Sequence, residues 1–151
     1  MKAWILIFSG LLLVGCSALQ PVAVVRVDGL TDLRINRDGM SGDLVLVLNN
    51  PNGVTIGAEQ VEVEVFINSQ RVGVVQLPFA QSIPKGPEQR LQLTVQAETK
   101  ALLNVLQEHW IQFLTGKEVE VGVQGEVRGS ALGIPVTIPV SSKENMKIQL
   151  Q

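Results

Sequence analysis

The sequence is poor in the residues that carry most protein chemistry. It has one cysteine, one histidine and no tyrosine among 151 residues. These counts exclude a disulfide framework and a Cys/His zinc cluster. Twelve basic residues against fourteen acidic ones leave no excess of positive charge, so no nucleic-acid partner is expected. A hydrophobic share of 46% beside 17% charged residues excludes a disordered chain and indicates one folded domain.

The first twenty residues have the pattern of an export signal. Met1-Lys2 is a short positive start, and an apolar run follows from Ala3 to Val14. This run has the length of a secretory signal core and is too short to span a bilayer comfortably. It ends in Leu13-Val14-Gly15-Cys16, with a small residue directly before the cysteine.

This segment resembles a bacterial lipoprotein signal, and Leu-Val-Gly-Cys matches the lipobox throughout. The resemblance implies that residues 1–15 are removed and that Cys16 becomes a lipidated first residue, with diacylglycerol on its thiol and often a fatty acid such as palmitate on its amino group. Ser17 stands where Asp usually signals retention in the inner membrane, which favours the outer membrane, facing the periplasm, if the cell is Gram-negative. An ordinary cleaved signal and an uncleaved helical anchor are the alternatives.

Lipidation at Cys16 would make the membrane the first partner of this chain. Two or three acyl chains hold a protein on a bilayer essentially permanently, because each buried methylene contributes about 0.8 kcal/mol. Residues 16–21 then form the lipidated N-terminus with a very short tether, and residues 22–151 form the folded domain. The domain is expected to lie close to the lipid surface.

Alternating apolar and polar residues predict β-strands in the rest of the chain. In residues 61–67, 91–97 and 119–127, nearly every second residue is apolar, usually valine or leucine. This alternation gives each strand one dry and one wet face. Leu44–Leu48 is a continuous apolar run, typical of a central strand covered on both faces. Further strands are expected at 22–27, 33–36, 72–77, 134–140 and 146–150. Turn sequences rich in Gly, Asn and Pro separate them: 38–39, 52–53, 68–70, 84–86 and 129–133.

One segment, from Glu98 to Gly116, has apolar residues at helical spacing instead. It predicts an α-helix around 99–115, with Thr99 as the N-cap and Gly116 as the stop. Its apolar stripe is expected to cover an open end or edge of the sheets. The stripe comprises Leu102, Leu103, Val105, Leu106, Trp110, Phe113 and Leu114.

The strand pattern predicts a mostly β fold. Pro135 and Pro139 lie in one predicted strand, and their missing amide hydrogens place that strand at an edge. Many short strands at regular spacing predict a two-sheet antiparallel β-sandwich, similar to immunoglobulin or fibronectin III domains, with the one helix.

The strand Leu44–Leu48 runs into Asn49-Asn50-Pro51-Asn52. This arrangement, followed by residues 65–73 and 83–97, resembles the late embryogenesis abundant (LEA) type 2 proteins, also called the WHy domain. The resemblance covers roughly residues 24–150 and implies a β-sandwich with one helix. Gly53 departs from it, since plant members often have a second proline there.

Asn50-Pro51-Asn52 also has a physical interpretation of its own. Proline fixes φ, the residue before it is extended, and Asn52-Gly53 tolerates positive φ. Asparagine side chains can bond back to the amides of their own turn. We interpret the motif as a structural turn, with a binding role as the alternative.

Candidates for catalysis or metal binding are few. His109 lies in the predicted helix, and no Ser, Asp or Cys is spaced as in a catalytic triad. The acidic stretch 28–43 fails the calcium-loop pattern, because Gly39 at the sixth position puts Arg34 first and Val45 last. We expect no catalytic residue, no metal, no cofactor and no small-molecule substrate. Outward glutamates are interpreted as solvated strand faces: Glu62, Glu64, Glu118, Glu120 and Glu126.

Two functions remain. The LEA resemblance implies a non-enzymatic, membrane-anchored protein of the desiccation and water-stress response, which acts by surface contact with unspecified client proteins or membrane. The alternative is an envelope adaptor lipoprotein that binds one protein partner through the edge strand 134–140 or the helix face.

Overall fold

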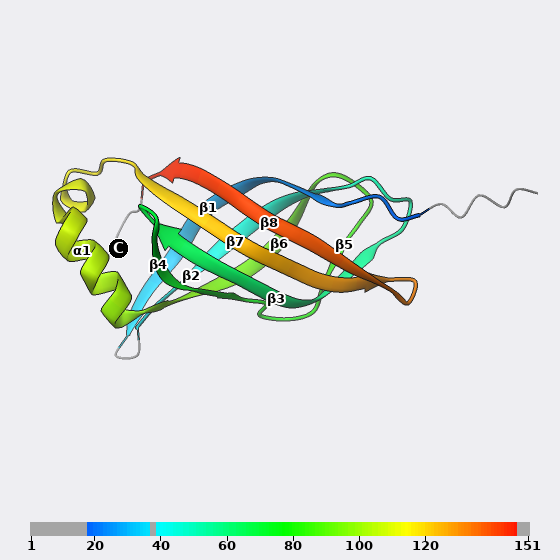
Figure 1. The fold of residues 1–151 in the computed structure, drawn as a ribbon, viewed down its shortest axis with the longest axis horizontal. Coiled ribbons are helices and arrows are strands. Elements are labelled where there is room, and N and C mark those ends of the chain that lie inside the picture. The colour runs from blue at the N-terminus through cyan, green and yellow to red at the C-terminus, as the bar shows by residue number, and fades with distance from the viewer. Residues whose placement is uncertain (1–17, 37–38, 148–151) are drawn as a thin grey trace, which may run out of the picture.

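The computed structural model describes residues 18–36 and 39–147. Within these ranges the chain forms eight strands and one helix (Figure 1). The strands are β1 (Ala23–Asn36), β2 (Gly39–Asn50), β3 (Ile56–Ile67), β4 (Gln70–Gln76), β5 (Gln81–Ile83), β6 (Gly86–Glu98), β7 (Val119–Ala131) and β8 (Ile134–Met146). Helix α1 (Thr99–Leu114) follows β6. The predicted signal, Cys16 and the end of the predicted strand 146–150 lie outside the described residues.

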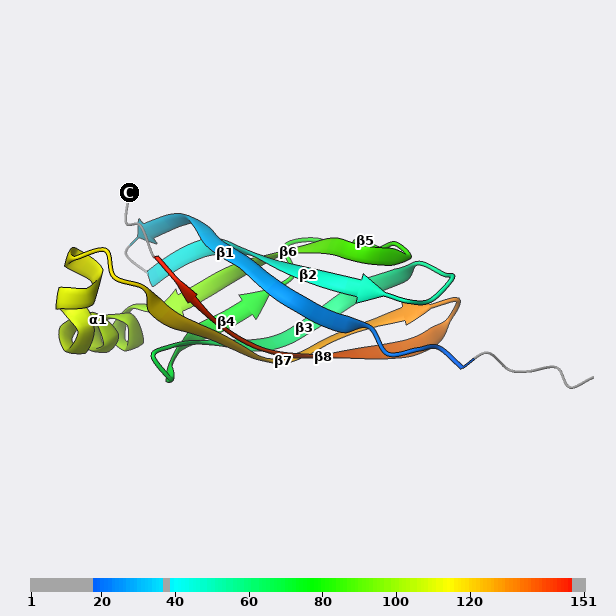
Figure 2. The same cartoon turned by 90° about the horizontal axis from the view of Figure 1, so that it is seen from above.

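All strand pairs are antiparallel, and they join into one sheet. The strand order is β1-β2-β6-β4-β3-β7-β8, and the short β5 pairs with β3 beside this path. The two outermost strands, β1 and β8, contact each other, although no ladder joins them within the described residues. The sheet therefore curls into a nearly closed barrel (Figure 2).

The mostly β fold with one helix is confirmed, but the prediction of a two-sheet sandwich is wrong. In a sandwich, β1-β2-β6 and β3-β7-β8 would be separate sheets. Strand β4 joins them, because it pairs with β3 on one side and with β6 on the other. Alternation along a strand marks only which face is dry, and a barrel and a sandwich share that pattern.

The barrel interior is aliphatic. Leu44, Leu46 and Leu48 of β2 are buried in the core, and Val47 between them is also fully buried. Since β2 lies between β1 and β6, the prediction of a central strand is confirmed. Its outer face is covered only in part, because Val45 is half-buried. Other strands also contribute side chains with less than 2% exposure, among them Ile56, Val63, Val65, Ile67, Ile83, Leu91, Leu93 and Ile138.

Several predicted boundaries need correction. The strands predicted at 22–27 and 33–36 are one strand, β1, whose register with β2 shifts at three bulges. The turn predicted at 129–133 is only Leu132-Gly133, because β7 continues to Ala131. Strand β5 was not predicted separately, since three residues are too few to show an alternation.

Strand β8 is a terminal strand of the sheet, which confirms the edge predicted from its two prolines. It pairs with β7 along its length, with Pro135 opposite Ser130 and Pro139 opposite Glu126. A terminal strand tolerates proline because a ladder is needed on one side only.

Helix α1 lies across one end of the barrel, where it contacts β4 and β6 (Figure 1). The prediction that Thr99 caps it is wrong: Glu98 occupies the cap position without a side-chain cap hydrogen bond, and Thr99 is the first helical residue. Gly116 follows the helix with a φ of 63°, as expected of a C-terminal stop. No helix in residues 18–36 and 39–147 is long and apolar enough to cross a bilayer.

The curvature of the barrel brings backbones close together at Gly129. A Cβ atom there would lie 1.8 Å from the carbonyl oxygen of Gly57 on β3, whereas a Cβ at Gly53 would meet nothing within 4 Å. We expect Gly129→Ala to lower the free energy of unfolding by about 1–3 kcal/mol, because strand β3 must move away. Gly53→Ala is the matched control, with an expected change within about 0.5 kcal/mol. Urea unfolding followed by far-ultraviolet circular dichroism measures both. Equal stability of the two variants would contradict the close packing.

Candidate functional site

The sequence motif Asn50-Pro51-Asn52 lies where β2 ends, at the end of the barrel opposite helix α1 (Figure 1). Asn50 and Asn52 are the buried polar residues in the part of the chain that the structure describes, with 1% and 8% exposure. Pro51 between them is exposed. A buried amide is stable only when its donors and acceptors are matched.

The Asn50 side chain holds two loops together. Its Nδ2 donates to the carbonyl oxygens of Val54 at 2.9 Å, Ile83 at 3.1 Å and Pro84 at 3.2 Å. Its Oδ1 accepts from the backbone N–H and the Nδ2 of Asn52, at 3.1 and 3.0 Å. One amide therefore joins the β2–β3 turn to the loop between β5 and β6.

The Asn52 side chain holds the N-terminal segment in turn. Its Oδ1 accepts from the backbone N–H of Gln20 at 2.6 Å, and its Nδ2 donates to the carbonyl oxygen of Gln20 at 2.8 Å. Leu19 packs against the core, and Val22 is buried. The chain is thus fixed to the barrel from Leu19 onward.

These contacts use the polar groups of both asparagines within the fold. The two N–H groups and the carbonyl oxygen of Asn50 all have internal partners. The arrangement gives the turn a mechanical role: it connects β2, the β5–β6 loop and the chain leading to the N-terminus.

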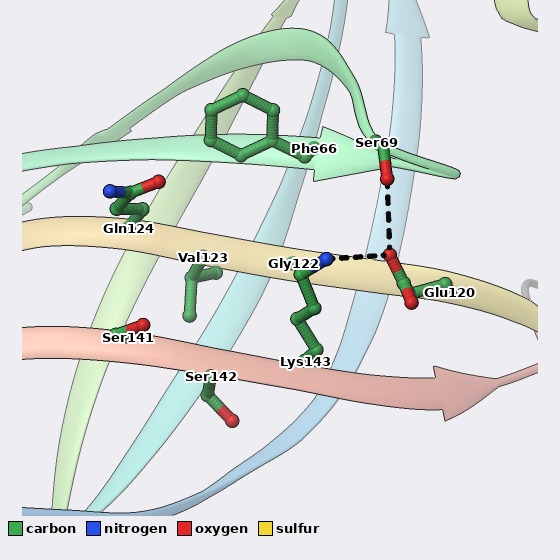
Figure 3. A pocket seen from close by; sticks show the side chains of 9 residues that line it. All are labelled: Phe66, Ser69, Glu120, Gly122, Val123, Gln124, Ser141, Ser142 and Lys143. Carbon is green, nitrogen blue, oxygen red and sulfur yellow. Dashed lines mark hydrogen bonds and ion pairs between the residues drawn. The ribbon is translucent and has the colours of Figure 1, made fainter.

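A groove of about 230 Å³ lies on the outer face of β3, β7 and β8 (Figure 3). It forms over Gly122, which presents no side chain. Glu120 accepts a hydrogen bond from Ser69 Oγ at 3.4 Å and pairs with Lys143 Nζ, also at 3.4 Å. The lysine side chain is 67% exposed, so the groove holds a solvent-exposed ion pair.

In the acidic stretch from residue 28 to residue 43, Asp28 is held by two ion pairs. Arg26 Nε and Arg90 Nη1 each lie 2.8 Å from a carboxylate oxygen of Asp28. The hydrogen bond from Arg26 lowers the pKa of Asp28 below its ordinary value. Among the described residues, no group of three or more acidic, His or Cys side chains could hold a metal ion. His109 is half-buried, at a non-helical φ of −122° within α1.

Charged side chains cover the outer face of the barrel. Arg128 pairs with Glu62 and Glu126, and Arg71 pairs with Glu64 and Glu98. Such exposed pairs contribute little to stability. Their effect is on solubility, because charges of both signs on wet strands discourage association between barrels.

Helix α1 presents an exposed apolar face, contrary to the prediction that its whole stripe covers the sheets. Val105 is its buried residue. Leu103, Trp110 and Leu114 are 50%, 55% and 77% exposed, and Ile111, which the predicted stripe omitted, is 55% exposed. His109 has non-helical φ and ψ angles and separates Leu103 from the other three residues along the helix. The four exposed apolar residues of α1 are together called the α1 face here.

Comparison with protein-family models gives a match to the late embryogenesis abundant protein family LEA_2 over residues 45–144, well over half of the chain. The chain belongs to this family. The predicted resemblance is thereby confirmed, and the matched range begins in β2 and ends in β8.

Two solved structures are similar to this LEA type 2 domain. The solution structure of AT1g01470 from Arabidopsis thaliana is 18% identical, with a TM-score of 0.58 over 87% of this chain and 84% of that one. The crystal structure of a protein from Archaeoglobus fulgidus is 12% identical, with a TM-score of 0.49 over 89% of this chain and 100% of that one. The comparison with curated proteins gives no match. At 18% identity, the similarity to the Arabidopsis protein is one of fold alone.

The sequence alone does not predict that Gln20 is the hydrogen-bond partner of the Asn50-Pro51-Asn52 turn. Gln20 and Asn52 are 32 residues apart, and no local pattern pairs an asparagine side chain with a distant backbone. Gln20 and Asn52 come together because strand β1 pairs with strand β2, with Ala23 opposite Asn49.

We expect Asn50→Asp to destabilise the LEA domain strongly. The carboxylate keeps the shape but loses the N–H groups, and it would face three carbonyl oxygens in a buried site. The free energy of unfolding at pH 7 should fall by about 3 kcal/mol or more. Part of this loss should be recovered near pH 4, because a protonated carboxyl group donates one hydrogen bond.

The control is Asn49→Asp, one residue earlier on β2 and half-buried. Chemical denaturation at both pH values gives the comparison. Equal loss in the two variants would show that negative charge at this end of the barrel, rather than the Asn50 contacts, is responsible.

Proposed function

We propose that this LEA type 2 chain is a non-enzymatic, lipid-anchored protein of the cell envelope that protects other proteins or membrane during water loss. It acts by surface contact. The observation that carries the proposal is the family match over residues 45–144, since LEA type 2 proteins are associated with desiccation and related stresses.

The opposite ends of the barrel support a division of roles. The chain from the N-terminus enters at the end held by Asn52, and the α1 face lies at the other end (Figure 1). A lipid anchor at Cys16 would hold the first end at the membrane. The α1 face would then point away from the lipid, accessible to clients.

The charged barrel wall suits a protector. Drying concentrates proteins and removes their hydration, so a folded protector must itself resist association. Arg71 and Arg128 form ion pairs on the outer face of the barrel, whereas the α1 face exposes large apolar side chains that are available for weak contacts.

The second candidate is an adaptor that binds one specific partner. The observation that favours it is again the α1 face, since four large apolar side chains of one helix are exposed, and exposed apolar side chains on a helix can dock on another protein. Strand β8 offers a further surface, because it is a terminal strand of the sheet that β1 contacts without forming a ladder within the described residues.

Loss of the anchor should abolish protection. In cells lacking the native gene, the wild-type chain should restore survival of drying, and its mature N-terminus should be Cys16 with the added mass of its acyl groups. Cys16→Ser should lose the acyl mass and restore survival at least about tenfold less well. Mass spectrometry and colony counts measure these results, with Ser17→Ala as the control that keeps the lipobox.

A non-acylated wild-type chain recovered from the cytosol would contradict the anchor. Unchanged survival of drying after gene deletion would contradict the stress function.

Crosslinking separates protector from adaptor. A photoreactive residue replacing Ile111 on the α1 face should give a diffuse set of adducts that grows during drying. The same residue replacing Thr137 on β8, or Gln96 on the charged wall, should give few. One dominant adduct of fixed stoichiometry from Ile111 or Thr137 would contradict general protection and support the adaptor.

A further inference from the structure

The hairpin between β7 and β8 has an unusual turn. Ala131 pairs with Ile134, so the turn consists of Leu132 and Gly133, with φ values of 52° and 79°. Positive φ values at both turn residues are required by a type I′ turn, whose central positions favour Asn, Asp or Gly. A leucine there adopts a backbone conformation that is unfavourable for an L-residue with a bulky side chain.

The same leucine is also placed in water. Leu132 is 82% exposed, the highest value among the exposed large apolar residues, and Ile134 is 55% exposed. A single exposed leucine needs no explanation. Exposure combined with an unfavourable backbone is different, because an asparagine would remove both costs, and such outliers concentrate where they serve a function.

The hairpin carries no charge that would oppose contact with lipid. The sequence contains no charged residue between Arg128 and Lys143. Its tip is therefore an apolar projection, defined here as the β7–β8 tip and made of Leu132 and Ile134.

The β7–β8 tip lies at the end of the barrel where the N-terminal segment enters. Ser130, just before the tip, pairs with Gly57, which follows the turn that contains Asn52. Asn52 holds Gln20 by two hydrogen bonds. Figures 1 and 2 both show the hairpin and the entering chain at one end, with α1 at the other.

The distance to a lipid anchor at Cys16 is short. Leu19 packs on the core, and the three residue steps from Cys16 to Leu19 span at most about 11 Å when fully extended. An acylated Cys16 would keep this end of the barrel beside the headgroups and leave the domain little freedom to turn over.

We propose that the β7–β8 tip inserts into the same membrane surface that holds the acyl chains of Cys16. Tip and anchor then form two contacts with the bilayer, which orients the barrel with the α1 face outward. This proposal rests on the proposed lipid anchor and adds a second membrane contact to it.

The test uses the full-length chain, processed in cells and reconstituted in phosphatidylethanolamine/phosphatidylglycerol vesicles. Leu132→Cys is labelled with an environment-sensitive fluorophore. Leu114→Cys on α1, 77% exposed in the native chain, is the matched control at the other end. Spin-labelled lipids should quench the Leu132→Cys label at least about threefold more strongly than the Leu114→Cys label. Thr137→Cys, further along β8, should give an intermediate value.

The unsubstituted chain separates failure of the tip from failure of the anchor. Its one cysteine reacts with the label only if its thiol is not acylated, so labelling there would overturn the anchor and the tip proposal that rests on it. No labelling, together with equal quenching at positions 132 and 114, would overturn the tip proposal and leave the anchor intact. The tip proposal would also be overturned if the label at Leu132→Cys were protected from lipid quenching and this position crosslinked to a second copy or to another protein.

Discussion

The end of the barrel that faces the N-terminus depends on one buried amide. Asn50 connects the β2–β3 turn to the β5–β6 loop, and through Asn52 it holds Gln20. A buried amide with matched donors and acceptors stabilises a fold, and one with lost partners destabilises it by more than it contributed. The position of the entering chain, the loops around it and any anchor that precedes them therefore follow from the geometry of this turn.

Much of the barrel could be predicted because its strands are regular. Alternation located β3, β6 and β7, the continuous run Leu44–Leu48 identified a central strand, and two prolines placed β8 at an edge. The sandwich prediction failed because the difference lies in β4, a strand of seven residues that pairs with both β3 and β6. Register between distant strands decides such pairing, and periodicity along one strand contains no information about it.

The candidate site could be predicted in part. The residues of the Asn-Pro-Asn turn and the family were recognisable, but the contact of Asn52 with Gln20 depends on long-range pairing of β1 with β2. The α1 face was mistaken for core because amphipathic spacing predicts which residues share a side, not whether a neighbour covers it. Leu132 was missed since its significance comes from its φ of 52° and its exposure together.

The aliphatic core has a spectroscopic consequence. The protein has no tyrosine, and Trp110, the single tryptophan among the described residues, is 55% exposed on α1. Its fluorescence emission reports the solvent around the helix and responds little to the state of the barrel interior. Trp110 is thus a fluorescent probe at the end of the barrel remote from the Asn-Pro-Asn turn. A molecule that binds over α1 would shift the indole emission to shorter wavelength, whereas a change inside the barrel would alter it little.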